Sequence, residues 1–256
     1  MTPAERLEAA IRHPRRPGRP AVMPYLVSGF PSHDAWSSAL ARVSQIADAI
    51  EVGVPFSDPM ADGPVIQRAS RVALDGGVTL RKILRSVRDL APGCPLVLMS
   101  YTNPLMQLGF ERAVDEAAEA GFSGFIVPDL PWEEGDALRT LLEARGMCAV
   151  QLVTPMTPDD RVATLGAGVG FTYAVTINGI TGAEIDLGAR TGYLDRVRRL
   201  SARPVCAGFG IRSAADIDAL TGHADGAIVG SALVDAMARG EDAEVFVRRL
   251  LGDADG

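Results

Sequence analysis

Two acidic side chains, eleven residues apart, are the best candidates for chemistry in this 256-residue chain. Glu51 lies in the apolar run of residues 47–54, which predicts a buried strand with a carboxylate near its carboxyl end. Asp62 follows on a loop stiffened by three prolines. Two carboxyl groups held over one pocket can divide general-acid and general-base work. This stretch is therefore the predicted seat of chemistry.

Each acid also has a purely structural interpretation. A carboxylate in a buried strand is costly unless it is paired or functional, so Glu51 could pair with an arginine on a neighbouring strand. Asp62 precedes Gly63-Pro64 and could cap a helix, and Asp58 is of the type found in turns. Spacing alone does not choose between Asp58 and Asp62 as the partner of Glu51.

Three glycine-rich segments follow predicted strands and indicate a second kind of site. They are Gly179–Gly182, Gly208–Ile211 and Gly230–Leu233. Bare backbone N–H groups and a helix amino terminus commonly bind phosphate at these positions of a barrel. With few basic residues nearby, a phosphate would be held mainly by backbone dipoles.

Short apolar runs alternate with helical patterns along the whole chain. Strands covered on both faces have this brief, uncharged character. The predicted strands are Ala21–Val27, Ala49–Val54, Leu96–Ser100, Gly124–Val127, Met147–Val153, Phe171–Val175, Pro204–Ala207 and Gly226–Val229. Eight strand–helix units in about 250 residues predict a single (β/α)8 TIM barrel over residues 1–256, with an extra amino-terminal helix at residues 3–12. A doubly wound open sheet is the alternative.

Several helices have readable boundaries. Thr157 with Pro158 predicts a helix start, and Ser213 with Asp216 resembles a capping box. Amphipathic patterns predict helices at residues 110–120 and 133–144.

Composition limits the classes of function. The net charge of −7 argues against nucleic acid or an anionic membrane as the main partner. The basic run of residues 12–19 is interpreted as a solvated connector, because its prolines and glycine prevent a regular basic face. No apolar stretch is long enough for a membrane span, and no signal peptide is evident. A cytoplasmic protein is expected.

Cysteine, histidine and lysine usage favours catalysis without a metal or an imine. Three cysteines lie in or beside apolar runs, which predicts reduced, buried thiols. The histidines are scattered, and no cluster suggests a metal site. Lys82, the single lysine, falls on a predicted exposed helix face, a poor position for Schiff-base chemistry.

The motifs together resemble the tryptophan synthase alpha subunit family. The stretch Glu51–Gln67, EVGVPFSDPMADGPVIQ, is similar to the long family signature. The other matching motifs are Tyr101–Pro104, Val127–Pro131, Gly179–Ala183, Gly208–Ile211 and Val229–Ser231. Resemblance of this extent implies one barrel that cleaves indole-3-glycerol phosphate to indole and glyceraldehyde 3-phosphate.

The resemblance also implies roles for individual residues. Glu51 and Asp62 match the two catalytic acids, and Asp58 falls in a structural turn. The remaining implied contacts lie in the indole pocket (Tyr25, where the family usually has phenylalanine, and Tyr173), beside Asp62 (Thr181) and at the phosphate (Gly182, Gly210, Gly230 and Ser231). Thr176-Ile177-Asn178 and Met60 depart from the family pattern.

Carbon–carbon cleavage of this kind needs an electron sink, and a protonated indole ring can supply one. Glu51 could deliver the proton to C3 and then accept one from the glycerol hydroxyl, while Asp62 stabilises the charge on the ring. No metal and no cofactor are expected in this chain.

The implied partner is a tryptophan synthase beta subunit that carries pyridoxal phosphate, in an alpha2-beta2 assembly. The family interface implies contacts at residues 54–63, 101–108 and 128–132, where Pro104, Leu105, Met106 and Trp132 look exposed. The alternatives are a free-standing lyase that releases indole, an inert barrel retained as an allosteric binding subunit, and a sugar-phosphate isomerase or epimerase.

Overall fold

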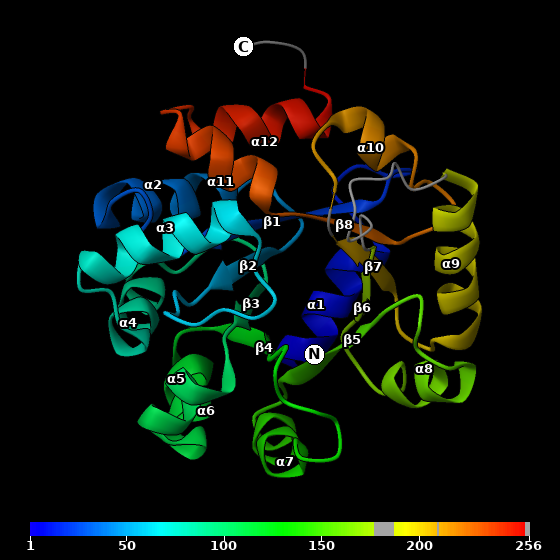
Figure 1. The fold of residues 1–256 in the computed structure, drawn as a ribbon, viewed down its shortest axis with the longest axis horizontal. Coiled ribbons are helices and arrows are strands. Elements are labelled where there is room, and N and C mark those ends of the chain that lie inside the picture. The colour runs from blue at the N-terminus through cyan, green and yellow to red at the C-terminus, as the bar shows by residue number, and fades with distance from the viewer. Residues whose placement is uncertain (177–186, 209, 254–256) are drawn as a thin grey trace.

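The eight predicted strands form a closed ring (Figure 1). The computed structural model describes residues 1–176, 187–208 and 210–253. All neighbouring strands are parallel, and β1 pairs with both β2 and β8, which excludes the open sheet. The strands are β1 (Ala21–Val27), β2 (Ile50–Gly53), β3 (Leu96–Met99), β4 (Phe122–Ile126), β5 (Cys148–Val153), β6 (Thr172–Val175), β7 (Val205–Gly208) and β8 (Gly226–Val229). The predicted (β/α)8 barrel is confirmed, with strand bounds that differ by one or two residues.

Helices surround the ring and cover the outer face of the strands (Figure 1). Those in the described part of the chain are α1 (Pro3–Arg12), α2 (His33–Val43), α3 (Pro64–Asp75), α4 (Leu80–Leu90), α5 (Thr102–Leu108), α6 (Phe110–Glu119), α7 (Asp136–Ala144), α8 (Asp159–Leu165), α9 (Leu187–Leu200), α10 (Ala214–Asp218), α11 (Ser231–Ala238) and α12 (Ala243–Leu251). None of these has the length and apolar character needed to cross a membrane.

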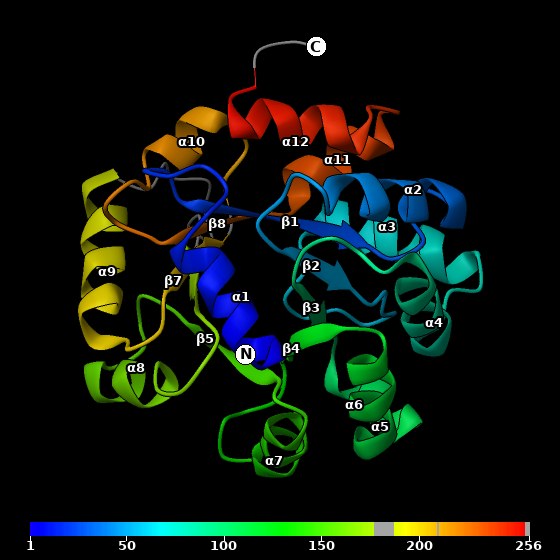
Figure 2. The same ribbon diagram turned by 180° about the vertical axis from the view of Figure 1, so that it is seen from behind.

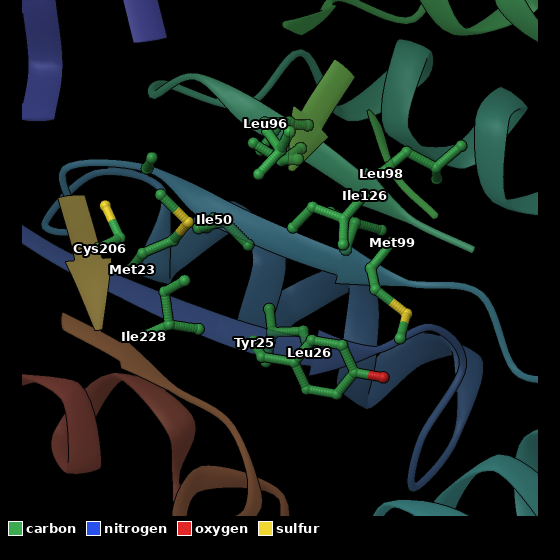
Figure 3. Close-up of a cluster of buried hydrophobic side chains, with 14 of the residues drawn as sticks. Met23, Tyr25, Leu26, Ile50, Leu96, Leu98, Met99, Ile126, Cys206 and Ile228 are labelled. Carbon is green, nitrogen blue, oxygen red and sulfur yellow. The ribbon is translucent and has the colours of Figure 1, made fainter. Parts of the chain in front are cut away.

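The barrel interior is packed with apolar and small side chains (Figure 3). Cys148 and Cys206 are free and buried, as predicted, whereas Cys94 is only partly buried. A Cβ on Gly124 would lie 2.5 Å from the Cys148 sulfur, and one on Gly226 would lie 2.7 Å from the Cys206 sulfur. The glycines therefore leave the space that these thiols fill, in a core without room for extra atoms.

The predicted extra helix, α1, lies across the ring of strands (Figure 2). Thr2 and Glu5 form a capping box at its start. Leu7 and Ile11 on its inner face are fully buried, and the Ala4 N–H donates to the carbonyl of Gly146, just before β5. This helix closes one end of the barrel and leaves the other end for the site.

Two predicted helix starts are wrong, whereas those at Phe110 and Ser213 are confirmed. Helix α8 begins at Asp159 with Pro158 as its N-cap, because the Thr157 hydroxyl instead accepts a hydrogen bond from the Thr154 N–H. Helix α7 begins at Asp136 rather than at residue 133, after a turn. Ser213 and its capping box at the start of α10 are as predicted.

Residues 12–19 form the predicted connector and are mostly exposed, but their arginines also hold specific partners. The Arg15 N–H donates to the buried Asp48 carboxylate at 2.7 Å, and the Arg15 Nε donates to the Ala47 carbonyl. Arg16 pairs with Asp253 beyond the last helix. The run therefore joins the start and the end of the barrel.

Arg19 provides the most complete of these links. Its Nε donates to Asp218 of α10 at 2.7 Å, and its Nη atoms donate to the carbonyls of Leu250 and Leu251 in the last turn of α12. Those carbonyls have no partner within the helix.

We expect Arg19→Ala to lower the free energy of unfolding by about 1–3 kcal/mol, because it leaves helix carbonyls without a donor. Urea denaturation measures this. Arg71→Ala is the matched control, since the exposed Arg71–Asp75 pair lies within one helix and is worth about 0.5 kcal/mol or less. Equal losses in the two variants would contradict the proposed link.

Candidate active site

A cavity of about 330 Å³ opens among residues that follow the carboxyl ends of the strands. This is the end of a barrel where active sites are found. Both predicted acids and most of the predicted substrate contacts line it. The lining residues are Tyr25, Glu51, Ala61, Asp62, Gly63, Ile66, Met99, Ile126, Pro128, Leu152, Tyr173, Gly210, Ile211, Ile228, Gly230 and Ser231.

Glu51 is a buried acid without a balancing charge. Its side chain is 4% exposed, and its Oε2 atom has no hydrogen-bond partner. Burial, and then the nearby Asp62 carboxylate, raise the pKa of Glu51 to about 8. The neighbouring strands β1 and β3 contain no arginine, so the predicted pair with an arginine on a neighbouring strand is wrong.

Asp62 is held in place by Tyr101, which lies between β3 and α5. The Tyr101 hydroxyl donates to Asp62 Oδ2 at 3.2 Å and accepts a hydrogen bond from the Ala61 N–H at 3.0 Å. Burial raises the pKa of Asp62, and the Tyr101 hydrogen bond opposes this rise. Asp62 is not a helix cap, since Gly63 precedes α3.

Asp58 takes no part in the cavity. It is exposed and accepts a hydrogen bond from its neighbour Ser57. The geometry therefore brings Asp62, and not Asp58, to the same cavity as Glu51.

Two tyrosines reach the cavity across glycines on neighbouring strands. A Cβ on Gly53 of β2 would lie 2.2 Å from the Tyr25 hydroxyl, and a Cβ on Gly208 of β7 would lie 2.3 Å from the Tyr173 hydroxyl. Atoms cannot approach so closely, so each ring occupies the space that a larger residue would fill. Both glycines are required to position the phenol groups.

The predicted phosphate contacts at Gly210, Gly230 and Ser231 lie together at the cavity wall. Gly230 precedes α11, and Ser231 is the first residue of that helix. The first N–H groups of a helix have no partner within it and favour an anion. Among the described residues that line the cavity, none is lysine, arginine or histidine. Thr181 and Gly182 lie outside the described residues.

Tyr101 is a site residue whose role the sequence did not indicate. It appeared only within a family motif, although an aromatic directly after an apolar strand is a usable signal. Phe56 packs against its ring at a centroid distance of 5.1 Å. Asp129 fixes the next residue by accepting from the N–H and hydroxyl of Thr102. These contacts orient the loop that presents Tyr101 to Asp62.

The described residues contain no group of three or more His, Cys, Asp or Glu side chains arranged to hold a metal ion. Lys82 lies on the exposed face of α4 and donates to the Gly77 carbonyl, away from the cavity.

The expected exposed apolar surface is partly wrong. Leu105 is fully buried, because α5 packs onto the barrel through it. Trp132 is half-buried beneath the Arg139 guanidinium, which lies 3.7 Å from the ring centroid. Met60 and Met106 are exposed, at 78% and 63%. Met60 lies in the loop that follows β2, and Met106 lies in α5, the helix that follows β3.

Comparisons with known proteins agree with this geometry. A family model described as tryptophan synthase alpha chain matches residues 11–254. The tryptophan synthase alpha chain of Nitratidesulfovibrio vulgaris (strain DP4) is 45% identical over 250 residues, covering 96% of this chain and 97% of that protein. The one from Roseiflexus sp. (strain RS-1) is 40% identical and covers 96% of this chain and 99% of that protein.

Solved structures give the same result. A tryptophan synthase structure from M. tuberculosis matches with a TM-score of 0.85 and 34% identity over 96% of both chains. A structure of the tryptophan synthase a2b2 complex from Pyrococcus furiosus matches with a TM-score of 0.83 and 34% identity, covering 91% of this chain and 98% of that chain. This chain belongs to the tryptophan synthase alpha chain family.

Proposed function

We propose that this chain is a lyase that cleaves indole-3-glycerol phosphate to indole and glyceraldehyde 3-phosphate. The main observation behind the proposal is that Glu51, a buried acid, and Asp62 line the same apolar cavity. Apolar walls suit an indole ring, and the loops at Gly210 and Gly230 suit a phosphate. Membership of the alpha chain family supports this choice of substrate.

Glu51 acts as the proton carrier. Its pKa of about 8 keeps the carboxyl group protonated near neutral pH. The Glu51 O–H bond breaks as a C–H bond forms at C3 of the indole, which leaves an iminium-like ring. The glycerol hydroxyl then loses its proton to the Glu51 carboxylate. The carbon–carbon bond breaks, its electron pair returns to the ring, and the aldehyde forms. Each such transfer is typically worth about 10²–10⁴-fold in rate.

Asp62 acts on the other end of the ring system. As a carboxylate it accepts the indole N–H and stabilises the positive charge that develops when C3 is protonated. The hydrogen bond from Tyr101 favours this ionised form. The proposal thus gives the two acids different roles, in keeping with their different surroundings.

The phosphate is held by backbone N–H groups at Gly210, Gly230 and Ser231. The amino terminus of α11 supplies the favourable dipole there. Binding of this remote group positions the indole over the acids, which converts binding energy into orientation.

The expected partner is a tryptophan synthase beta subunit, with pyridoxal phosphate bound in that subunit. Related structures are titled tryptophan synthase and its a2b2 complex. Met60, on the loop that carries Asp62, and Met106, on α5, are exposed and offer apolar surface for such a contact. A beta subunit bound there would receive indole directly. The assembly expected is alpha2-beta2.

Glu51→Gln should abolish indole release and leave substrate binding measurable, because glutamine keeps the shape of the side chain but carries no transferable proton. Turnover is followed by indole formation, and binding by calorimetry with indole-3-glycerol phosphate. Glu134→Gln, at an exposed position, is the matched control and should behave as wild type. Substantial turnover by Glu51→Gln would refute the role of Glu51.

Glu51→Gln should also change how stability depends on pH. Because the folded-state pKa is raised from 4.5 to about 8, protonated Glu51 contributes stability that is complete below pH 4.5 and is lost as pH rises towards 8. Relative to Glu51→Gln, wild type should lose on the order of 2–4 kcal/mol of unfolding free energy between pH 5 and 8.5. Urea denaturation across this range tests it. If the unfolding free energies of wild type and Glu51→Gln changed with pH in parallel, Glu51 would ionise as freely as an exposed acid.

Adding a beta subunit from a related organism should increase indole-3-glycerol phosphate cleavage by this chain. The assay compares indole formation by the chain alone and after titration with the beta subunit. High activity alone with no gain on addition would instead indicate a free-standing lyase. Binding without turnover in either condition would indicate an allosteric subunit.

A further inference from the structure

Tyr25 carries a hydroxyl at the cavity for which the described part of the chain shows no hydrogen bond. The residue is 5% exposed and lines the cavity. The Tyr25 hydroxyl is not among the fully buried unpartnered atoms of the described residues, so it faces the cavity. A phenol hydroxyl at the wall of a cavity is available to donate to a partner that becomes charged there.

The position of Tyr25 points to Glu51 as that partner. The two residues are direct neighbours in the register of β1 and β2, and adjacent strands lie about 4.8 Å apart. The Tyr25 ring leans along β2 to Gly53, two residues beyond Glu51 on the same face. Figure 3 shows its hydroxyl oxygen directed away from Met23 and Ile50.

Glu51 needs a donor as soon as it gives up its proton. Its ionised carboxylate would be buried, with Oε2 unpartnered and Asp62 repelling it. The other titratable groups that face it are the phenols of Tyr25 and Tyr173 and the thiol of Cys206. No cation of the described part of the chain lines the cavity.

The other hydroxyls are less suited to this task. Tyr101 already donates to Asp62, and Tyr173 stands on β6, which is not a neighbour of β2 in the ring. Tyr25 alone combines adjacency to Glu51 with a hydroxyl that no described residue engages.

We infer that the Tyr25 hydroxyl donates a hydrogen bond to the Glu51 carboxylate once that group has lost its proton, which makes Tyr25 a positioning residue for the acid. The phenol keeps its own proton throughout, because only a hydrogen bond forms. Rotation of the Glu51 side chain towards Gly53 is the one movement required. The bond holds the carboxylate for the return proton.

Titration of Glu51 in Tyr25→Phe tests the inference without reference to the reaction. Protein labelled with ¹³C at the glutamate carboxyl carbons is followed by NMR, and the Glu51 signal is assigned by its loss in Glu51→Gln. A hydrogen bond to a charged group should be missing in Tyr25→Phe, so the Glu51 midpoint should move upward by about one to two pH units.

Two further variants keep the test specific. Tyr193→Phe removes the hydroxyl of another buried tyrosine, one that donates to the Val153 carbonyl outside the cavity, and should leave the Glu51 midpoint unchanged. Gly53→Ala places a methyl group where the Tyr25 hydroxyl now lies and should move the midpoint upward like Tyr25→Phe. An unchanged midpoint in Tyr25→Phe, or an equal shift in Tyr193→Phe, would overturn the inference.

A kinetic measurement rests on the proposed function and separates the two ideas. If protonated Glu51 cleaves indole-3-glycerol phosphate, the basic limb of kcat/KM should move upward in Tyr25→Phe by the same amount. A purely structural defect would lower kcat/KM at every pH and leave the limb in place, which would count against the inference. A shifted titration in a chain that cleaves nothing would support the role of Tyr25 and reject the proposed reaction.

Discussion

The burial of one carboxyl group, Glu51, is the constraint on which the arrangement of the site depends. An ionised carboxylate inside a barrel without a neighbouring cation is expensive. The protein lowers this cost by keeping Glu51 protonated, since burial and Asp62 raise its pKa to about 8. A protonated acid at neutral pH is the form that can give a proton to a substrate. The same desolvation that penalises the charge therefore prepares the group for chemistry.

The glycine–tyrosine contacts give the cavity its particular walls. Gly53 and Gly208 leave room for phenol rings to lie across neighbouring strands, so that both tyrosines line the cavity. A side chain at either glycine would displace its ring, because the core has no free volume to absorb it. Polar groups are thereby placed in an otherwise apolar cavity.

The two ends of the barrel are stabilised by different interactions. At the end closed by α1, arginines of residues 12–19 bind Asp48, Asp253 and the last carbonyls of α12. At the cavity end, Glu51 lies in β2, and the loops that follow the strands carry Asp62, Gly210 and Gly230. Separating the stabilising contacts from the site lets the loops serve binding, as is usual for this architecture.

The barrel, the family and the position of Glu51 in a buried strand could all be predicted from the sequence alone. The reason is that apolar periodicity and long motifs are local properties of the chain. The choice of Asp62 required the family resemblance, and its anchor on Tyr101, 39 residues away, emerged only in the folded structure. Tertiary structure also decided the contacts of Arg15–Arg19 and the burial of Leu105. These features join segments that are distant in sequence, so they exist only after β1 pairs with β8 and the ring has closed.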